Sequence, residues 1–193
     1  MTKLKIQPVM YNSRRLNEVA DKIVTVFNPI MNDYQINDRL DSLVLKLILS
    51  ESVNNDISTE LLCGHFLKLL SECGTPILGI TSLTMGSWSY GMGSPTYKSA
   101  YVSTARSEFG RLDSDIHVER VVIEALHELG HVFGLSHHEG PLPKKTSNGR
   151  YCPMDISHSE SVLGEEICWA EYISLRDPNL FCENCYQILK SSS

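Results

Sequence analysis

The sequence predicts a single α/β domain in which a twisted, mixed β-sheet packs against helices. Its 193 residues are enough for one domain with a substantial hydrophobic core. Over residues 1–137, short apolar runs typical of strands alternate with segments whose apolar residues recur at helical spacing, and this order is typical of a sheet covered by helices. Residues 138–193 have little periodic structure, so we expect an irregular C-terminal segment within the same domain.

The first strand and the first helix are expected near the N-terminus. Residues 3–10 alternate between polar and apolar side chains, as the residues of a strand do. A helix is expected over residues 13–27 because its apolar side chains recur on one face, and Asn28-Pro29 should end it. A second strand is expected over residues 34–40. Residues 43–49 are apolar and fit either a strand or a helix.

The middle of the chain continues this alternation. We expect a helix over residues 58–73, ended by Gly74-Thr75-Pro76, and then a buried strand over residues 77–81. Residues 86–95 are rich in glycine and aromatic side chains and fit a loop with an edge strand. Residues 99–106 fit another strand of the sheet.

A long amphipathic helix is expected after this strand. The candidates for its N-cap are Asp113, Ser114 and Asp115, whose side-chain oxygens can accept hydrogen bonds from the first turn. Apolar residues at helical spacing form its buried stripe, namely Val118, Val122, Ala125, Leu129 and Val132.

The end of this helix carries the most specific pattern in the chain, the histidine-rich segment 127–137. His127 and His131 are four residues apart, so they lie one helical turn from each other on the same face. Gly134 allows the helix to stop and the chain to turn, which brings His137 back as a third ligand. Three imidazoles with a fourth position left for water are typical of a catalytic zinc site.

Glu128 supplies the acid–base group that such a site needs. Bound zinc lowers the pKa of its water from about 15.7 to near 7 and polarises a carbonyl group. Glu128 is one step round the helix from the first ligand, where it can accept the proton of this water and pass it to the leaving amine. The pattern therefore predicts hydrolysis of peptide bonds, and the same groups could also hydrolyse a non-peptide amide.

A second group of residues has the composition of a structural zinc site. His138 directly follows the histidine-rich segment, and neighbouring side chains in an extended chain point in different directions. Together with Cys152, Cys182 and Cys185 it would form a closed Cys₃His site. Cys168 is the alternative for one of these positions, and a redox pair or free thiols are the alternative for Cys182-Glu183-Asn184-Cys185.

Composition sets the expected location and partners. The net charge of -6 argues against general nucleic-acid binding, and no apolar run is long enough to span a membrane. Residues 1–8 lack the apolar core of a signal peptide, so we expect a cytoplasmic or nuclear monomer that acts on peptides or proteins. Because thiols stay reduced there, the six cysteines favour metal binding over disulfides.

The order of these motifs resembles the archaemetzincin family of zinc metallopeptidases. The resemblance lies in the segment 127–137, in Cys152-Pro153-Met154 and in Cys182-x-x-Cys185, and it extends upstream to the strands 77–81 and 102–106. It includes the N-terminal strand and helix more loosely. It implies a metzincin-like sandwich with one catalytic and one structural zinc ion. It also implies that Met154 is the Met-turn methionine beneath the zinc-binding histidines, where its soft thioether can pack closely.

Two features depart from the family pattern. His138 stands where the family has a cysteine, but histidine is also a normal zinc ligand. The spacings over residues 139–151 and 155–181 are longer than in the family, and longer loops cost little stability. These spacings leave open which side chain completes the structural site.

The remaining polar and aromatic candidates are expected to be mainly structural. Trp88, Tyr90 and Met92 fit either the rim of a substrate cleft or a packed hairpin, and Tyr151 is a weaker candidate to assist catalysis. Residues without metal-ligand spacing are expected to have no role in the chemistry, namely His65, His117, His158, Cys63 and Cys73.

The sequence thus predicts a zinc-dependent metallopeptidase with two zinc ions. Residues 1–137 would form the sheet and helices, and residues 138–193 the Met-turn and the structural zinc segment. The alternative is a zinc-stabilised binding protein with little or no protease activity. Glu128 weighs against this alternative, because a purely structural site has no use for a base.

Overall fold

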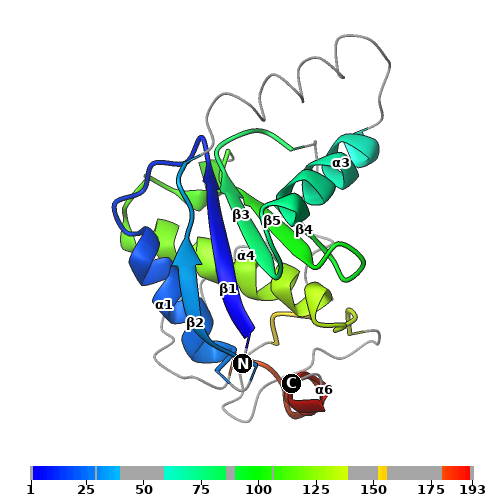
Figure 1. The fold of residues 1–193 in the computed structure, drawn as a ribbon. Coiled ribbons are helices and arrows are strands. Elements are labelled where there is room, and N and C mark those ends of the chain that lie inside the picture. The colour runs from blue at the N-terminus through cyan, green and yellow to red at the C-terminus, as the bar shows by residue number, and fades with distance from the viewer. Residues whose placement is uncertain are drawn as a thin grey trace.

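The computed structural model describes residues 2–28, 30–39, 59–85, 90–105, 107–138, 152–155 and 180–191. Within these ranges a five-stranded sheet has α-helices on both faces (Figure 1). The strands lie in the order β2-β1-β3-β5-β4, with the following bounds: β1 Thr2–Val9, β2 Met31–Ile36, β3 Ile77–Thr81, β4 Gly91–Ser94 and β5 Ser99–Ser103.

The sheet is mixed, because one edge strand runs against the others. β1 pairs in parallel with β2 and β3, and β3 pairs in parallel with β5. β4 pairs with β5 in the antiparallel direction, with Gly91 opposite Val102 and Ser94 opposite Ser99. The predicted fold class, a mixed sheet packed against helices, is confirmed.

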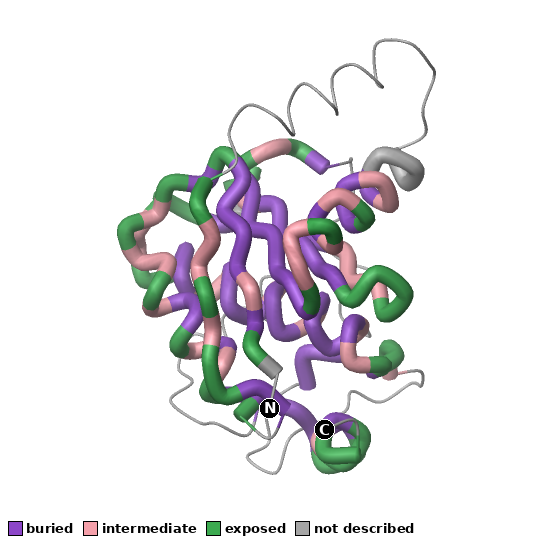
Figure 2. The backbone as a smooth tube through the Cα atoms, in the orientation of Figure 1, coloured by how far each residue is buried: buried purple, intermediate pink, exposed green. Residues whose placement is uncertain are grey.

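Helices α1 (Leu16–Val26) and α4 (Asp115–Val132) cover one face of the sheet, and α3 (Thr59–Glu72) covers the other. Leu4 and Ile6 of β1 pack with α1 and α4, whereas Val9 packs on the α3 side. All five residues of β3 are buried, because helices lie on both sides of this central strand. The buried strands form the centre of the molecule in Figure 2.

The second strand lies earlier in the chain than residues 34–40, where the sequence places it. The chain leaves α1 through hydrogen bonds from the amides of Ile30 and Met31 to the carbonyl of Phe27. Ile30 and Met31 are both buried in the core. Strand β2 therefore begins at Met31, which pairs with Thr2 of β1. Residues 43–49 lie outside the described part of the chain.

The C-terminal segment contains a helix that the sequence pattern does not predict, α6 (Glu183–Ser191). The chain just before it packs on α1, since the rings of Phe181 and Phe27 are 5.5 Å apart. Only Cys185 and Leu189 of α6 are buried, and two apolar contacts are too few to give a helical pattern in the sequence.

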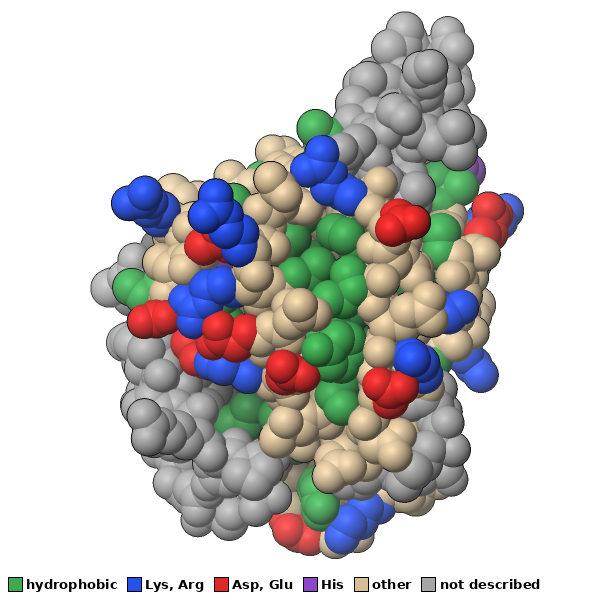
Figure 3. Space-filling view, turned by 60° about the vertical axis from the view of Figure 1, so that its left-hand side comes forward, with side chains coloured by type: hydrophobic (Ala, Val, Ile, Leu, Met, Phe, Trp, Pro, Cys, Tyr) green, Lys and Arg blue, Asp and Glu red, His purple; other side chains and the backbone are tan. Residues whose placement is uncertain are grey.

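Charged side chains of both signs are interspersed around a central group of hydrophobic side chains on the face seen in Figure 3. Ion pairs join Lys3 of β1 to Asp33 of β2 at 3.0 Å and Arg15 to Glu18 of α1 at 2.7 Å. No helix of the described ranges is both long and apolar enough to cross a membrane.

Candidate metal centre and active site

Helix α4 begins and ends at residues that set the position of the histidines. The hydroxyl of Ser114 accepts a hydrogen bond from the amide of His117 at 3.1 Å, so Ser114 is the N-cap among the three candidates. After Val132 the chain turns through Gly134, which has a φ of +87°. The amide of Leu135 then donates to the carbonyl of Gly130 at 2.9 Å, and the turn carries His137 back toward the helix.

The three histidines of segment 127–137 converge through their Nε2 atoms. Nε2 of His131 lies 3.2 Å from that of His127 and 2.9 Å from that of His137. Nε2 of His137 lies 3.2 Å from that of His127. Tetrahedral zinc with Zn–N bonds of about 2.05 Å separates its nitrogen ligands by about 3.3 Å. The triangle therefore has the dimensions that a zinc ion requires.

Backbone carbonyls orient two of these rings. Nδ1–H of His127 donates to the carbonyl of Pro153 at 2.6 Å, and Nδ1–H of His131 donates to the carbonyl of Leu135 at 2.9 Å. In this tautomer the Nε2 lone pairs face one another, which is the arrangement that binds a cation.

The histidines are also held in the neutral form that binds metal. Burial lowers the pKa of His127 to about 4, and it lowers the pKa of His131 and of His137 as well. Neutral imidazole is the ligand form, so these rings need lose no proton on binding near pH 7.

Glu128 is buried beside the histidines, with only 6% of its surface exposed. Burial raises the pKa of Glu128 well above its usual value, and the carboxyl of Glu124, which shares a hydrogen bond with it, raises that pKa further. The backbone amide of Gly93 donates to the Glu128 carboxyl and lowers the same pKa. Glu124 lies one helical turn before Glu128, so its spacing was the signal that could have identified it.

Strand β4 lies directly against α4 because two of its residues are glycines. A Cβ atom on Gly93 would lie 2.0 Å from the backbone oxygen of Glu128, and a Cβ on Gly91 would lie 2.7 Å from Cγ of Glu128. Alternate glycines in an edge strand permit such an approach of one backbone to another. The pattern Gly91-Met92-Gly93 could have indicated this contact in the sequence.

An open cleft of about 750 Å³ lies between β4 and the end of α4. Tyr90 and Met92 line it, which favours the cleft-rim interpretation of this segment, although Tyr90 also packs on Phe109 with a ring distance of 5.7 Å. Trp88 lies outside the described residues. The cleft also contains the groups expected to carry the chemistry, namely His127, Glu128, His131 and His137, together with Glu124.

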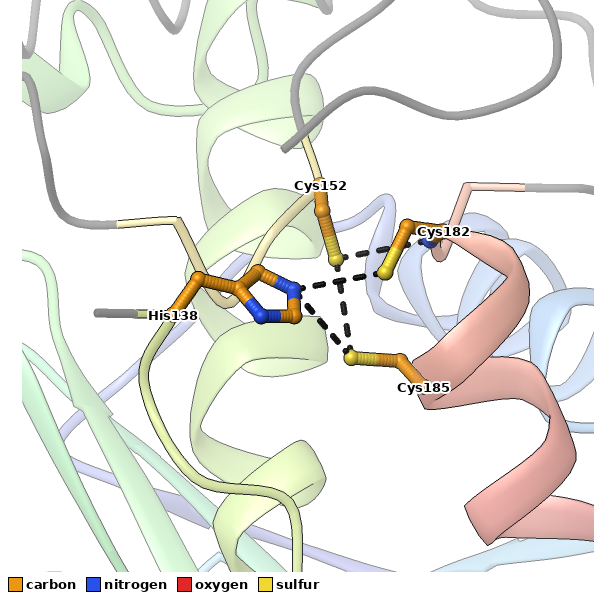
Figure 4. Close-up of side chains that lie close together, drawn as sticks. All are labelled: His138, Cys152, Cys182 and Cys185. Carbon is orange, nitrogen blue, oxygen red and sulfur yellow. Dashed lines mark hydrogen bonds between the residues drawn. The ribbon is translucent and has the colours of Figure 1, made fainter. Parts of the chain in front are cut away.

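A second cluster brings together His138, Cys152, Cys182 and Cys185 (Figure 4). Nε2 of His138 lies 3.3 Å from Sγ of Cys182 and 3.4 Å from Sγ of Cys185. Sγ of Cys152 lies 3.8 Å from Sγ of Cys185, too far for a disulfide and close to the sulfur spacing of about 3.8 Å around tetrahedral zinc. We call this group the Cys₃His cluster.

The thiols of the Cys₃His cluster change one another's pKa values through hydrogen bonds. Hydrogen bonds with Cys152 and Cys185 hold the pKa of the Cys182 thiol well below its usual value. A thiolate is the form of cysteine that binds zinc. His138 fills the fourth corner of the cluster, and Cys168, the alternative ligand, lies outside the described residues.

Met154 is fully buried and packs against α4 at Gly130, the residue before His131. A Cβ atom on Gly130 would lie 2.5 Å from Sδ of Met154, so glycine is needed for this contact. Met154 thus lies against the helix that carries two of the histidines, as a Met-turn methionine would.

The other candidates from the sequence lie away from the cleft or outside the described residues. His117 is a core histidine, whose ring bonds the hydroxyl of Tyr11 at 2.9 Å and the carbonyl of Phe109 at 3.2 Å. Cys63 is a buried residue of α3, and its sulfur accepts a hydrogen bond from the hydroxyl of Tyr101. His65 is half-buried on α3 and Cys73 follows this helix, whereas Tyr151 and His158 lie outside the described ranges.

Comparison with known proteins finds that part of this chain is similar to one peptidase family. Residues 71–148 match the family model of peptidase family M54. The archaemetzincin of Thermococcus kodakarensis is 38% identical over 110 residues, which are 50% of this chain and 58% of that protein. The predicted resemblance to the archaemetzincins is confirmed. The archaemetzincin of Nanoarchaeum equitans is 33% identical over 98 residues, 51% of this chain and 40% of that protein, so the matches span about half the length of these relatives.

Crystal structures of archaemetzincins share the fold of this chain. The structure from Methanopyrus kandleri has a TM-score of 0.62 at 21% identity and covers 99% of this chain and 94% of that one. The structure from Archaeoglobus fulgidus, complexed with malonate, has a TM-score of 0.59 at 23% identity and covers 97% and 99%. The M54 match contains the histidine-rich segment and His138 but ends before Cys152.

Proposed function

We propose that this chain is a zinc-dependent metallopeptidase that cleaves peptide or protein substrates. The observation that carries the proposal is the triangle of neutral imidazoles from His127, His131 and His137, which opens into a cleft beside a buried carboxyl group. The match of residues 71–148 to the family model of peptidase family M54 supports it. A purely structural metal site would have no use for Glu128.

In this proposal, zinc held by the three histidines would supply Lewis-acid polarisation and a water of lowered pKa. The Glu128 carboxylate accepts a proton from the attacking water and then donates it to the leaving nitrogen of the substrate. The amide of Gly93 fixes the carboxylate in the cleft while it does so. The carbonyl of Pro153 keeps the proton of His127 on Nδ1 throughout.

We propose a structural role for a second zinc ion in the Cys₃His cluster. The four ligand atoms lie within 4.8 Å of one another, and all three cysteines are buried. Four protein ligands leave no open position for a substrate or water. The ion would join the chain around Cys152 to α6, which stabilises the fold without taking part in the chemistry.

The test compares the zinc-loaded wild-type chain with Glu128→Gln on a broad peptide library. The isosteric change removes the base, so kcat/KM should fall by about 10²–10⁴-fold while the zinc content stays the same. Glu119→Gln is the matched control, because Glu119 lies on the same helix but pairs with Lys22 outside the cleft, and its activity should equal that of the wild type. Equal cleavage by the wild type and Glu128→Gln, or no cleavage by either, would overturn the proposal in favour of a zinc-stabilised binding protein.

A further inference from the structure

We infer that the two proposed metal sites are coupled, so that an ion in the Cys₃His cluster raises the affinity of the three-histidine site for its own ion. The inference rests on the zinc-binding part of the proposed function and adds a means of regulating the active site. It is based on two short segments of the chain. In each of them, residues adjacent in sequence serve different metal sites.

The first connection is Cys152-Pro153-Met154. Sγ of Cys152 belongs to the Cys₃His cluster, 3.8 Å from Sγ of Cys185. The next residue, Pro153, accepts the 2.6 Å hydrogen bond from Nδ1 of His127. Three consecutive residues therefore hold the cluster, orient a catalytic histidine and pack against α4. An ion that fixes the sulfur of Cys152 also fixes the carbonyl that orients His127.

The second connection is the pair His137-His138. Nε2 of His137 belongs to the three-histidine triangle, and Nε2 of His138 lies 3.3 Å from Sγ of Cys182. The amide of His138 donates to the carbonyl of Met154 at 2.9 Å, which ties this connection to the first one. His137 has exposed surface, so the residue next to it is a main restraint on its position.

The third histidine, His131, is oriented by its own helix turn and serves as the reference position in the experiment. Nδ1 of His131 donates to the carbonyl of Leu135 within its own turn, and among the described residues His131 shares no hydrogen bond with the Cys₃His cluster. An ion in the cluster should therefore set the positions of His127 and His137 relative to a His131 that the helix already fixes. Outer hydrogen-bond partners of this kind change metal affinity by about 10–100-fold.

The experiment measures metal affinity at each site of the full chain, with cobalt(II) as a spectroscopic probe and zinc in competition with a chelator. Cobalt bound to thiolates absorbs differently from cobalt bound to imidazoles, so each site is observed separately. Cys182→Ser removes a cluster ligand that, unlike Cys152 and His138, is not part of either connection to the three-histidine site. It should lower the affinity of the three-histidine site by about 10–100-fold. Cys73→Ser, which changes a half-buried thiol after α3, is the control and should leave both affinities unchanged.

The reciprocal variant keeps the inference falsifiable if Cys182→Ser fails to fold. His131→Ala leaves the three-histidine site empty at a zinc concentration that fills it in the wild type, and it alters neither connection. By linkage, the cluster should then lose affinity by the same factor by which an ion in the cluster strengthens the three-histidine site. Affinities at the second site within two-fold of wild type, in either folded variant, would overturn the coupling. Because no step of the assay needs catalysis, a chain with independent sites could still be a peptidase, and a chain without peptidase activity could still show coupling.

Discussion

Replacing Gly93 by alanine tests the close contact between β4 and α4. The added Cβ would lie 2.0 Å from the backbone oxygen of Glu128 and 3.0 Å from Cβ of His131. A Cβ atom essentially never lies closer than 3.0 Å to a non-bonded heavy atom. A backbone oxygen cannot rotate away as a side chain can, so the strand must move off the helix by more than about 1 Å.

The expected cost follows from overpacking and from the lost hydrogen bond. Overpacking of this kind costs about 1–3 kcal/mol, and in a domain of this size each kcal/mol lowers Tm by about 2–4 °C. The movement also takes the Gly93 amide away from the Glu128 carboxyl. Misplacement of a catalytic group by about 1 Å can lower the rate by about 10²-fold. We therefore expect Gly93→Ala to lower Tm by about 2–12 °C and kcat/KM by about 100-fold.

The assays are thermal unfolding of the zinc-loaded chain and cleavage of a peptide that the wild type hydrolyses, with zinc content measured in each sample. Gly64→Ala is the matched control, because a Cβ on Gly64, within α3, would meet no atom within 4 Å. That change should stabilise the chain by about 1 kcal/mol, since alanine favours the helix. An unchanged Tm and an unchanged rate for Gly93→Ala would refute the proposed contact between β4 and the base.

Two further predictions concern the N-cap of α4 and Tyr11, whose hydroxyl bonds His117 in the first turn of that helix. Ser114→Ala removes the N-cap acceptor of the His117 amide and should lower the free energy of unfolding in urea by about 1 kcal/mol, and an unchanged value would mean that the cap contributes nothing. Burial raises the pKa of Tyr11 from 10.0 to about 12 in the folded chain. The hydroxyl of the unfolded chain therefore ionises first as the pH rises above 10. The stability that the folded chain has below pH 10 decreases from there and is lost as the pH rises through 12. That loss should reach about 3 kcal/mol in metal-free protein and be absent in Tyr11→Phe, and equal pH dependence in both proteins would contradict the assignment.

Local sequence was enough to locate the helix of the candidate site and most strands. The positions of His127 and His131 on one face follow from the helical repeat alone, and the turn at Gly134 follows from the conformational freedom of glycine. The buried strand β3 (Ile77–Thr81) has the bounds expected from its apolar run. These features depend on residues within a few positions of one another, so the sequence contains all that decides them.

Tertiary structure decided what surrounds these residues. His138 meets Cys182 across 44 residues, His127 meets the carbonyl of Pro153 across 26, and the amide of Gly93 reaches Glu128 from another strand. Strand order and the position of α6 were decided in the same way. The physical reason is that a backbone carbonyl or amide is present at every residue, so a sequence does not mark the one that packing brings to a histidine or a carboxylate.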